Sequence, residues 1–348
     1  MALLWAEGFE HYGLAATGRT NMLNGLYNSV SAGAYSSAIV NTNARTGACC
    51  ICLNNGSNGG EGGIRRPIAY SGNEIGTAFG LYITSFSQSR QHVTAFEFGA
   101  AGVISIVVNE TGGVEVRAGG SSGTILGATA AGLLTAASWN HLEYRVVRDD
   151  VVGEVEVVIN GIVQMILTNI NTGTVEYTTI KSSSYANNTY IDDWVFKDGA
   201  GEPSWLTIGP ARVLTGYLVA DEPGGDWSVV GAASGAEAID ETIPDGDTTY
   251  IQASIAGDVS EFTMPTLPPE AENILGVYIP TMAKLASPGV GHMRTSLVSG
   301  SDVSDGGDYP ITSAYTYRGD VFEFDPATGL QWQKTDLEAA ILRVEKTL

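Results

Sequence analysis

The chain has 348 residues, of which 44% are hydrophobic, 16% are charged and 44 are glycine. This hydrophobic content excludes an intrinsically disordered chain, which combines low hydrophobicity with high charge. The glycine content excludes a helical bundle, because glycine destabilises helices and is favoured in turns. We therefore expect many short strands joined by glycine-rich turns, in two domains of ordinary size or one large one.

The net charge is −21, from 17 basic and 38 acidic residues. Nucleic-acid binding needs clustered Lys and Arg, and the only adjacent basic pair is Arg65–Arg66. We therefore expect no nucleic-acid partner, and for the same reason no anionic membrane. The uncharged stretch 118–140 holds five glycines and six hydroxyl side chains, too polar for a membrane span. No basic residue precedes Arg19, so we predict no secretory signal and synthesis in a cytosol.

Three cysteines lie close together, at Cys49, Cys50 and Cys52. An odd number within four positions does not form a disulfide framework. The spacing lacks the separated cysteine pairs of a zinc site, so we expect small core residues in a strand.

Turn signals such as Asn24–Gly25 and Asn160–Gly161 separate short runs rich in Val, Ile, Tyr and Thr. This pattern is typical of an all-β sandwich or barrel. The predicted strands of the first part are Phe79–Phe86, Val103–Val108, Val114–Arg117, Trp139–Val147, Glu154–Ile159, Ile162–Leu167 and Tyr190–Lys197.

A polar, glycine-containing segment at 198–203 separates two parts of different charge. Residues 1–200 carry 10 basic and 16 acidic side chains, and residues 201–348 carry 7 and 22. We therefore predict two β-sandwich domains, 1–200 and 201–348. The second would contain strands at Arg212–Ala220, Thr249–Ile255, Ile274–Ile279, Met293–Val298 and Ala314–Tyr317, with a short helical turn running into a strand at the end of the chain.

Acid–base catalysis on a glycosidic bond needs two carboxylates, one with a raised pKa. Glu154 and Glu156 share one face of a strand whose other face is apolar, so we expect both to be solvated. Asp192 and Asp193 are adjacent in a strand and would point to opposite faces, which prevents them from acting on one bond.

Other catalytic motifs are weak or missing. The four histidines, at positions 11, 92, 141 and 292, show no spacing of two or four residues. A Gly-x-Ser-x-Gly string at 119–123 is followed by further glycines, which disfavour the helix that a nucleophile elbow requires. The glycine-rich stretch 56–63 lacks the Gly-Lys-Ser/Thr ending of a phosphate-binding loop.

Two loops, 244–249 and 301–308, offer oxygen ligands for calcium. Their spacing does not fit an Asp-x-Asp-x-Asp-Gly loop with a later Glu, so we expect solvated turns capped by Asp side chains. We predict no metal and no cofactor.

Tryptophan side chains are the remaining candidates for a binding surface. Trp139 and Trp194 lie in predicted strands with apolar neighbours and are expected in the core. Trp205, Trp227 and Trp332 lie near Gly, Pro or Asp, where they could be exposed as interface anchors or as platforms for sugars. Burial in a second core is the alternative. Of the two exposed roles, we favour the interface.

The order Trp139–Val147, Glu154–Gly161, Tyr190–Phe196 resembles that of concanavalin/laminin-G-like jelly rolls, and Glu7–Glu10 resembles their first strand. The resemblance implies that residues 1–198 form two antiparallel sheets packed face to face. The calcium- and sugar-binding residues of the lectin relatives are not matched.

The second part resembles a module of tailed-bacteriophage structural proteins. The stretches that carry this resemblance are Ile208–Val213, Asp226–Gly231, Asp247–Tyr250, Ile274–Tyr278 and Asp325–Trp332. It implies a virion protein made in the host cytoplasm, with no catalytic residues, whose partners are other virion proteins and copies of itself. We therefore expect a non-enzymatic component of the tail tip or fibre region. The alternatives are a capsid decoration protein and a module that binds carbohydrate, such as a host-surface glycan, or a receptor.

Overall fold

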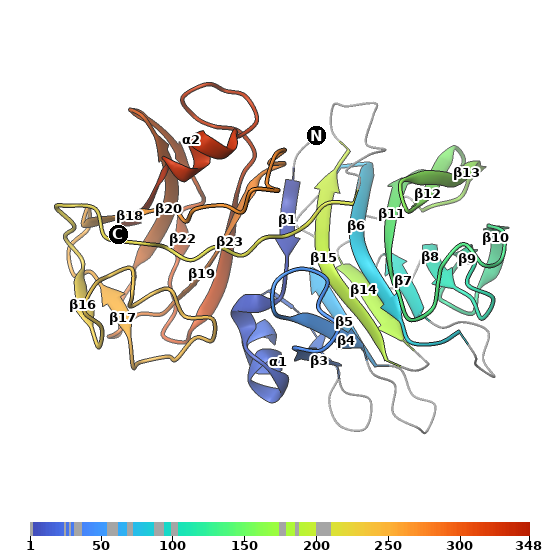
Figure 1. The fold of residues 1–348 in the computed structure, drawn as a ribbon, viewed down its shortest axis with the longest axis horizontal. Coiled ribbons are helices and arrows are strands. Elements are labelled where there is room, and N and C mark those ends of the chain that lie inside the picture. Colours follow the sequence, from blue (N-terminus) through green and yellow to red (C-terminus); the bar gives the residue numbers. More distant parts are fainter. Residues whose placement is uncertain are drawn as a thin grey trace. The chain divides into compact units, whose positions relative to one another are not determined.

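The computed structural model describes residues 3–23, 26–27, 29–30, 37–53, 62–67, 72–86, 94–98, 104–173, 179–184, 188–199 and 210–348. The chain divides into two compact units, Met1–Leu214 and Thr215–Leu348. Nearly all regular structure is antiparallel β, which confirms the predicted all-β class (Figure 1). Among the described residues, no helix is long and apolar enough to cross a membrane.

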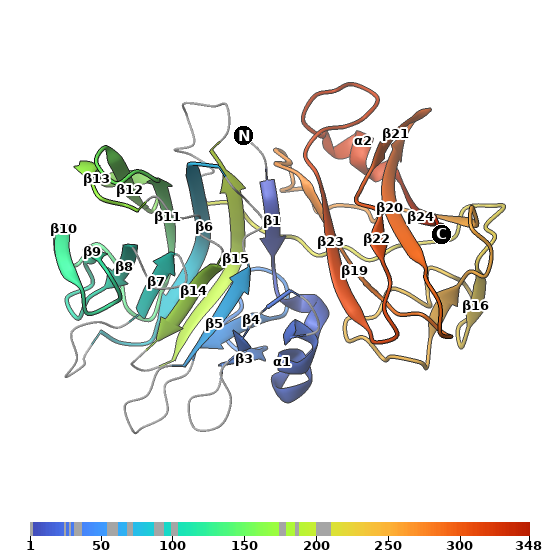
Figure 2. The same ribbon diagram turned by 180° about the vertical axis from the view of Figure 1, so that it is seen from behind.

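The first unit contains two large antiparallel sheets (Figure 1, Figure 2). The first sheet runs in the order β13 (Ile162–Ile170), β12 (Gly153–Ile159), β11 (Trp139–Val147), β6 (Glu74–Ile83), β15 (Thr189–Asp198), β4 (Cys50–Leu53) and β3 (Ser37–Val40), with β1 (Leu3–Glu7) paired to β15. The second sheet runs in the order β10 (Thr124–Ala128), β9 (Val114–Ala118), β8 (Ile104–Val108), β7 (Thr94–Phe98), β14 (Thr179–Ser184), β5 (Gly62–Pro67) and β2 (Ser29–Val30). Two short helices, η1 (Glu10–Tyr12) and α1 (Ala15–Leu23), follow β1.

Aromatic rings fill the core of the first unit. Trp194 is fully buried, with its ring edge-on to Trp5 at 5.0 Å and to Phe79 at 6.4 Å. Its indole N–H donates to Thr77 Oγ1 at 2.6 Å, so the one polar atom of the ring is satisfied. Tyr144 packs against Phe79 from β11. Leu142, Tyr144 and Val146 of β11 therefore face this core, and their neighbours in sequence point to the outer face of the first sheet.

Asp192 and Asp193 were predicted to point to opposite faces of a regular strand, but β15 is irregular at these two residues. The pairing of β15 with β6 shifts register between Asp192 and Val195, and Asp193 has a left-handed φ of 51°. Both carboxylates are buried, and both accept hydrogen bonds from Arg45 and Thr46. They fix a loop rather than reach opposite faces.

The cysteines occupy the positions expected of core residues. Cys50 and Cys52 are buried in β4 against Tyr190, whereas Cys49 is half-buried, and all three thiols are free. Burial raises the pKa of Cys52 to about 11 and raises that of Cys50 further.

The second unit is built on a sheet in the order β18 (Val259–Thr263), β24 (Ile341–Lys346), β20 (His292–Ser299) and β21 (Asp302–Asp305), with β22 (Tyr309–Pro310) paired to β20. Two strand pairs complete it, β16 (Ser228–Val230) with β17 (Tyr250–Gln252) and β19 (Val277–Ala283) with β23 (Thr316–Phe322).

The secondary structure of the second unit tests two of the predicted elements. The predicted helical turn and final strand are present as α2 (Lys334–Glu338) and β24. The predicted strand Arg212–Ala220 is wrong: residues 211–220 have no regular structure. The Val219 N–H and the Ala220 carbonyl bond to the neighbouring β18, both to Thr263.

Candidate functional site

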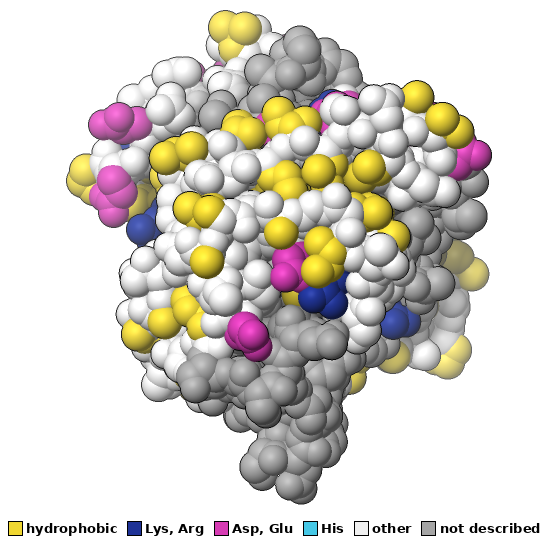
Figure 3. All heavy atoms as spheres, turned by 90° about the vertical axis from the view of Figure 1, so that its right-hand side faces the viewer, with side chains coloured by type: hydrophobic (Ala, Val, Ile, Leu, Met, Phe, Trp, Pro, Cys, Tyr) yellow, Lys and Arg dark blue, Asp and Glu magenta, His cyan; other side chains and the backbone are white. Residues whose placement is uncertain are grey.

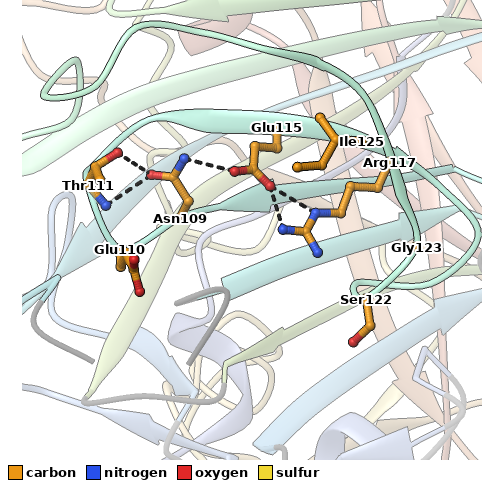
Figure 4. A pocket seen from close by; sticks show the side chains of 8 residues that line it. All are labelled: Asn109, Glu110, Thr111, Glu115, Arg117, Ser122, Gly123 and Ile125. Carbon is orange, nitrogen blue, oxygen red and sulfur yellow. Dashed lines mark hydrogen bonds and ion pairs between the residues drawn. The ribbon is translucent and has the colours of Figure 1, made fainter. Parts of the chain in front are cut away.

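A pocket of about 560 Å³ opens on the second sheet, at strands β9 and β10 and the turn between β8 and β9 (Figure 4). The residues that line it are Asn109, Glu110, Thr111, Glu115, Arg117, Ser122, Gly123 and Ile125. A cavity of this size is typical of sites for small ligands.

Asn109 forms the turn between β8 and β9 and reaches into the site. Its Oδ1 accepts from the Thr111 N–H at 3.0 Å, from Thr111 Oγ1 at 2.7 Å and from the Gly113 N–H at 3.0 Å. Its Nδ2 donates to Glu115 Oε1 at 3.1 Å. One turn residue therefore fixes the loop and orients a carboxylate on the sheet.

Glu115 and Arg117 are two residues apart on β9, so they share one face of the sheet. Arg117 donates through Nε at 2.9 Å and Nη2 at 2.5 Å to Glu115 Oε2, and through Nη1 at 2.7 Å to the Ser121 carbonyl (Figure 4). The two residues are 9% and 5% exposed. Their planar groups are thus held rigidly at the pocket wall, which is the preorganisation that selective binding requires.

Ile125 supplies an apolar wall beside these polar groups. It pairs with Arg117 across β9 and β10 and is 52% exposed. Ile162, Val163 and Ile166 of β13, the edge strand of the first sheet, are also exposed. Figure 3 shows hydrophobic atoms scattered over the side of the molecule that it draws. The site thus offers hydrogen-bond donors and acceptors next to apolar surface.

The Gly-x-Ser-x-Gly string forms the β9–β10 hairpin turn and not a nucleophile elbow. The Gly123 N–H bonds to the Gly120 carbonyl at 2.7 Å, and β10 follows where a helix would be needed. A Cβ at Gly123 would lie 1.8 Å from the Ala118 carbonyl oxygen, so the tight turn requires glycine there.

The predicted tryptophan sites are not assembled by the structure. Trp205 lies outside the described residues. Trp332 is 1% exposed and donates to the Phe322 carbonyl at 3.1 Å, so its prediction as an exposed platform is wrong. Trp227 is half-buried against the second core, with its indole N–H on the Asp258 carbonyl at 3.1 Å. The Gly, Pro and Asp residues near Trp227 and Trp332 indicate turns, but both indole rings pack toward the core from these turns.

The two loops considered for calcium are held by their own side chains. Asp245 accepts from the Thr249 N–H and hydroxyl, and Asp247 pairs with Lys284. Asp305 and Asp308 pair with Arg294 and His292, respectively. Within the described part of the chain, no three His, Cys, Asp or Glu side chains are grouped as metal ligands.

A second group of polar residues lies on the outer face of the first sheet, and the sequence did not reveal it. Glu156 of β12 is 2% exposed, which corrects the prediction that it is solvated; only Glu154 is half-exposed. On β11, His141 and Glu143 are 4% and 5% exposed, with His141 Nε2 3.1 Å from Glu143 Oε1. The Val-rich pattern of β12 indicated its core face correctly but gave no sign that its other face is also covered.

Aromatic side chains lie further along the outer face of the first sheet. Trp139 of β11 is half-buried next to Tyr82 of β6, with ring centroids 5.7 Å apart. Tyr82 in turn lies 5.6 Å from Tyr190 of β15. Trp139, predicted as a core residue, lies on the face opposite Leu142 and Tyr144, where it packs against the small hydrophobic cluster of Cys50, Cys52 and Tyr190.

No protein-family model matches the chain, and no curated protein matches it. Solved structures do match. An endo-β-1,4-glucuronan lyase from the fungus Trichoderma reesei is 12% identical over 50% of this chain and 93% of its own, with a TM-score of 0.39. A GH131 β-glucanase catalytic domain from Podospora anserina is 10% identical over 58% and 98%, with a TM-score of 0.41. The exoplasmic/lumenal domain of VIP36, in a Ca²⁺/Man-bound form, is 12% identical over 51% and 88%, with a TM-score of 0.36.

At these identities the likeness concerns the fold alone, and it agrees with the predicted concanavalin-like jelly roll. The prediction that the chain is not an enzyme is corrected, because matched structures include a polysaccharide lyase and a β-glucanase domain. That prediction considered only carboxylates close together in sequence. The sheet brings Glu143 and Glu156 onto one face from separate strands, where a search of the sequence for local motifs does not find them.

Proposed function

We propose that the first unit binds carbohydrate in the pocket at β9, β10 and the β8–β9 turn. The observation that carries this proposal is the rigid network of Asn109, Glu115 and Arg117 on the pocket wall, next to the exposed side chain of Ile125. Planar amide, carboxylate and guanidinium groups can bond neighbouring hydroxyls of a sugar, and an apolar side chain can contact its C–H face.

The charge of the pocket favours a neutral glycan over an anionic one. Its described lining holds two carboxylates, Glu110 and Glu115, and a single cation, Arg117. Arg117 already bonds Glu115, so its charge is largely compensated. A uronate or sulfate group would meet net negative charge here and would be repelled.

A glycan array on the intact protein tests the proposal, followed by calorimetry with the sugar that binds. Glu115→Gln keeps the shape of the side chain but weakens its bonds to Arg117 and to hydroxyls, and Ile125→Ala removes the apolar wall. Both variants should weaken binding at least tenfold. Ile162→Ala is the matched control, because Ile162 is 63% exposed, against 52% for Ile125, but lies outside the pocket lining. Equal affinity of all three variants, or no neutral glycan bound, refutes the proposal.

The role of a tailed-phage virion component remains a prediction that rests on the sequence resemblance. Its tests are an image of labelled particles, with density expected at the tail tip or fibre and not on the capsid lattice, and the oligomeric state of the isolated chain. A glycan-binding pocket is compatible with that role, since a surface that contacts a host glycan needs such a site.

A further inference from the structure

Three buried polar side chains gather on the outer face of the first sheet: His141, Glu143 and Glu156. In the antiparallel pairing of β11 with β12, Glu143 is opposite Val158 and Arg145 is opposite Glu156. Glu143 and Glu156 are therefore diagonal neighbours, whose Cα atoms are typically about 7–8 Å apart. Inverting glycoside hydrolases hold their two carboxyl groups about 6.5–9.5 Å apart, a separation that side chains on diagonal positions can span.

Two polar atoms of this group have no hydrogen-bond partner among the described residues, Glu156 Oε1 and His141 Nδ1. Leaving such atoms buried and unpaired costs free energy, so each requires a partner from outside the sheet. His141 Nε2 lies within hydrogen-bond distance of Glu143, so Nδ1 is the ring nitrogen without a partner among the described residues.

The nearest cation does not neutralise Glu156. Arg145 lies opposite Glu156 in the ladder, but its guanidinium bonds Glu74 through Nε at 2.6 Å and Glu154 through Nη1. Burial raises the pKa of Glu156, and the charges of Glu154, Glu143 and Glu74 raise it further against the opposing effect of Arg145. Glu156 is thus suited to carry a proton.

Trp139 and Tyr82 lie further along the same face, next to His141. Trp139 is two residues before His141 on β11, and Tyr82 pairs directly with Trp139. The residues of β6 opposite His141 and Glu143 are Gly80 and Ala78, and the Arg45 side chain lies over Gly80, where a Cβ would be 2.5 Å from Arg45 Cδ. Half-buried aromatic rings next to hydrogen-bonding groups suit a sugar ring, which has apolar and polar surfaces.

We propose that Glu143 and Glu156 form the acid–base pair of a second site, which hydrolyses a neutral polysaccharide, and that Trp139 and Tyr82 hold a sugar ring beside them. For its substrate class this inference rests on the proposed carbohydrate binding. Glu156 donates its proton to the glycosidic oxygen as the bond from that oxygen to C1 breaks. Glu143 takes a proton from a water molecule whose oxygen bonds to C1. One reducing end and one hydroxyl form, and the proton on Glu143 returns to Glu156 through solvent.

The test measures new reducing ends after incubation of the protein with β-glucan, xylan, mannan and arabinan. Glu156→Gln and Glu143→Gln should each lower the rate at least 100-fold, the scale of general acid–base catalysis. Trp139→Ala should raise KM with a smaller effect on kcat. Asp150→Asn, in the exposed loop after β11, is the control and should retain the wild-type rate.

Circular dichroism and glycan binding by each variant show whether the fold survives. If Glu156→Gln unfolds, Glu156→Asp keeps the carboxyl group and should fold but cleave slowly, because the acid is withdrawn by one methylene. Wild-type rates in the two glutamine variants, or no reducing ends from any of the four polysaccharides, overturn this inference. Glycan binding in the pocket would stand in that case, since Glu115→Gln and Ile125→Ala test it separately.

Discussion

Asp193 Oδ1 accepts a hydrogen bond of 2.8 Å from the backbone N–H of Val213. This bond joins the irregular part of β15 to the last residues of the first unit. Arg45 strengthens the connection, because its Nη1 donates both to Asp193 and to the Ala211 carbonyl. The neighbouring Asp192 is fully buried and accepts the backbone N–H groups of Arg45 and Thr46.

Asp192 should make the stability of the protein fall with rising pH. Burial, followed by the charge of Asp193, raises its pKa from 3.8 to about 7. A raised pKa means that the folded state holds the proton more tightly than the unfolded state. Its contribution is therefore fully present below pH 4 and is lost as the pH rises through 7, by on the order of a few kcal/mol.

Urea unfolding at intervals from pH 5 to pH 8 measures this effect. The midpoint of the unfolding transition that reports the first unit should fall over this range in the wild type and change less in Asp192→Asn, which cannot ionise. Arg45 and Cys50 face the same carboxylate, but neither titrates in this range, so the slope reports Asp192. An identical slope in both proteins would contradict the assignment.

Removing Arg66 should destabilise the first unit by about 3–5 kcal/mol, because it would leave the buried carboxyl group of Glu7 without its cationic partner. Glu7 is fully buried, and Arg66 Nη1 donates to its Oε2 at 3.0 Å while stacking over the Trp5 ring at 3.9 Å. The measurement is the free energy of unfolding of Arg66→Leu. Arg65→Leu is the matched control: Arg65 is adjacent, half-buried and on the other face of β5, and its loss should cost under about 1 kcal/mol. Equal losses in the two variants would contradict this prediction.

The all-β class and many strands could be predicted from the sequence, because turn residues and alternation are local signals. Asn160–Gly161, for example, forms the tight hairpin between β12 and β13, with both residues at positive φ. The pocket and the Glu143–Glu156 pair could not be found in this way, since both depend on which strands become neighbours. Alternation also placed Glu156 on the correct side of β12 but could not show that this side is covered.

Trp332 should contribute to stability and not to binding. It is buried among Phe322, Leu337 and other core residues of the second unit. Trp332→Ala should therefore destabilise that unit by about 3–5 kcal/mol, the usual cost of removing a buried aromatic ring. Trp227→Ala, at a half-buried position, should cost less. Unfolding in urea measures both, and a Trp332→Ala variant of wild-type stability that loses a ligand would contradict the burial seen here.

The thiols of Cys50 and Cys52 should be unreactive in the folded protein. Burial is the main cause that raises the pKa of both groups, so almost no thiolate is present at pH 8. In the native chain, only Cys49 should react with a chromogenic disulfide reagent, and it should react slowly. Cys49 is half-buried, and burial is the main cause that raises its pKa. Three thiols should react at once in urea. Rapid reaction of two or more thiols in the native chain would show that β4 is accessible.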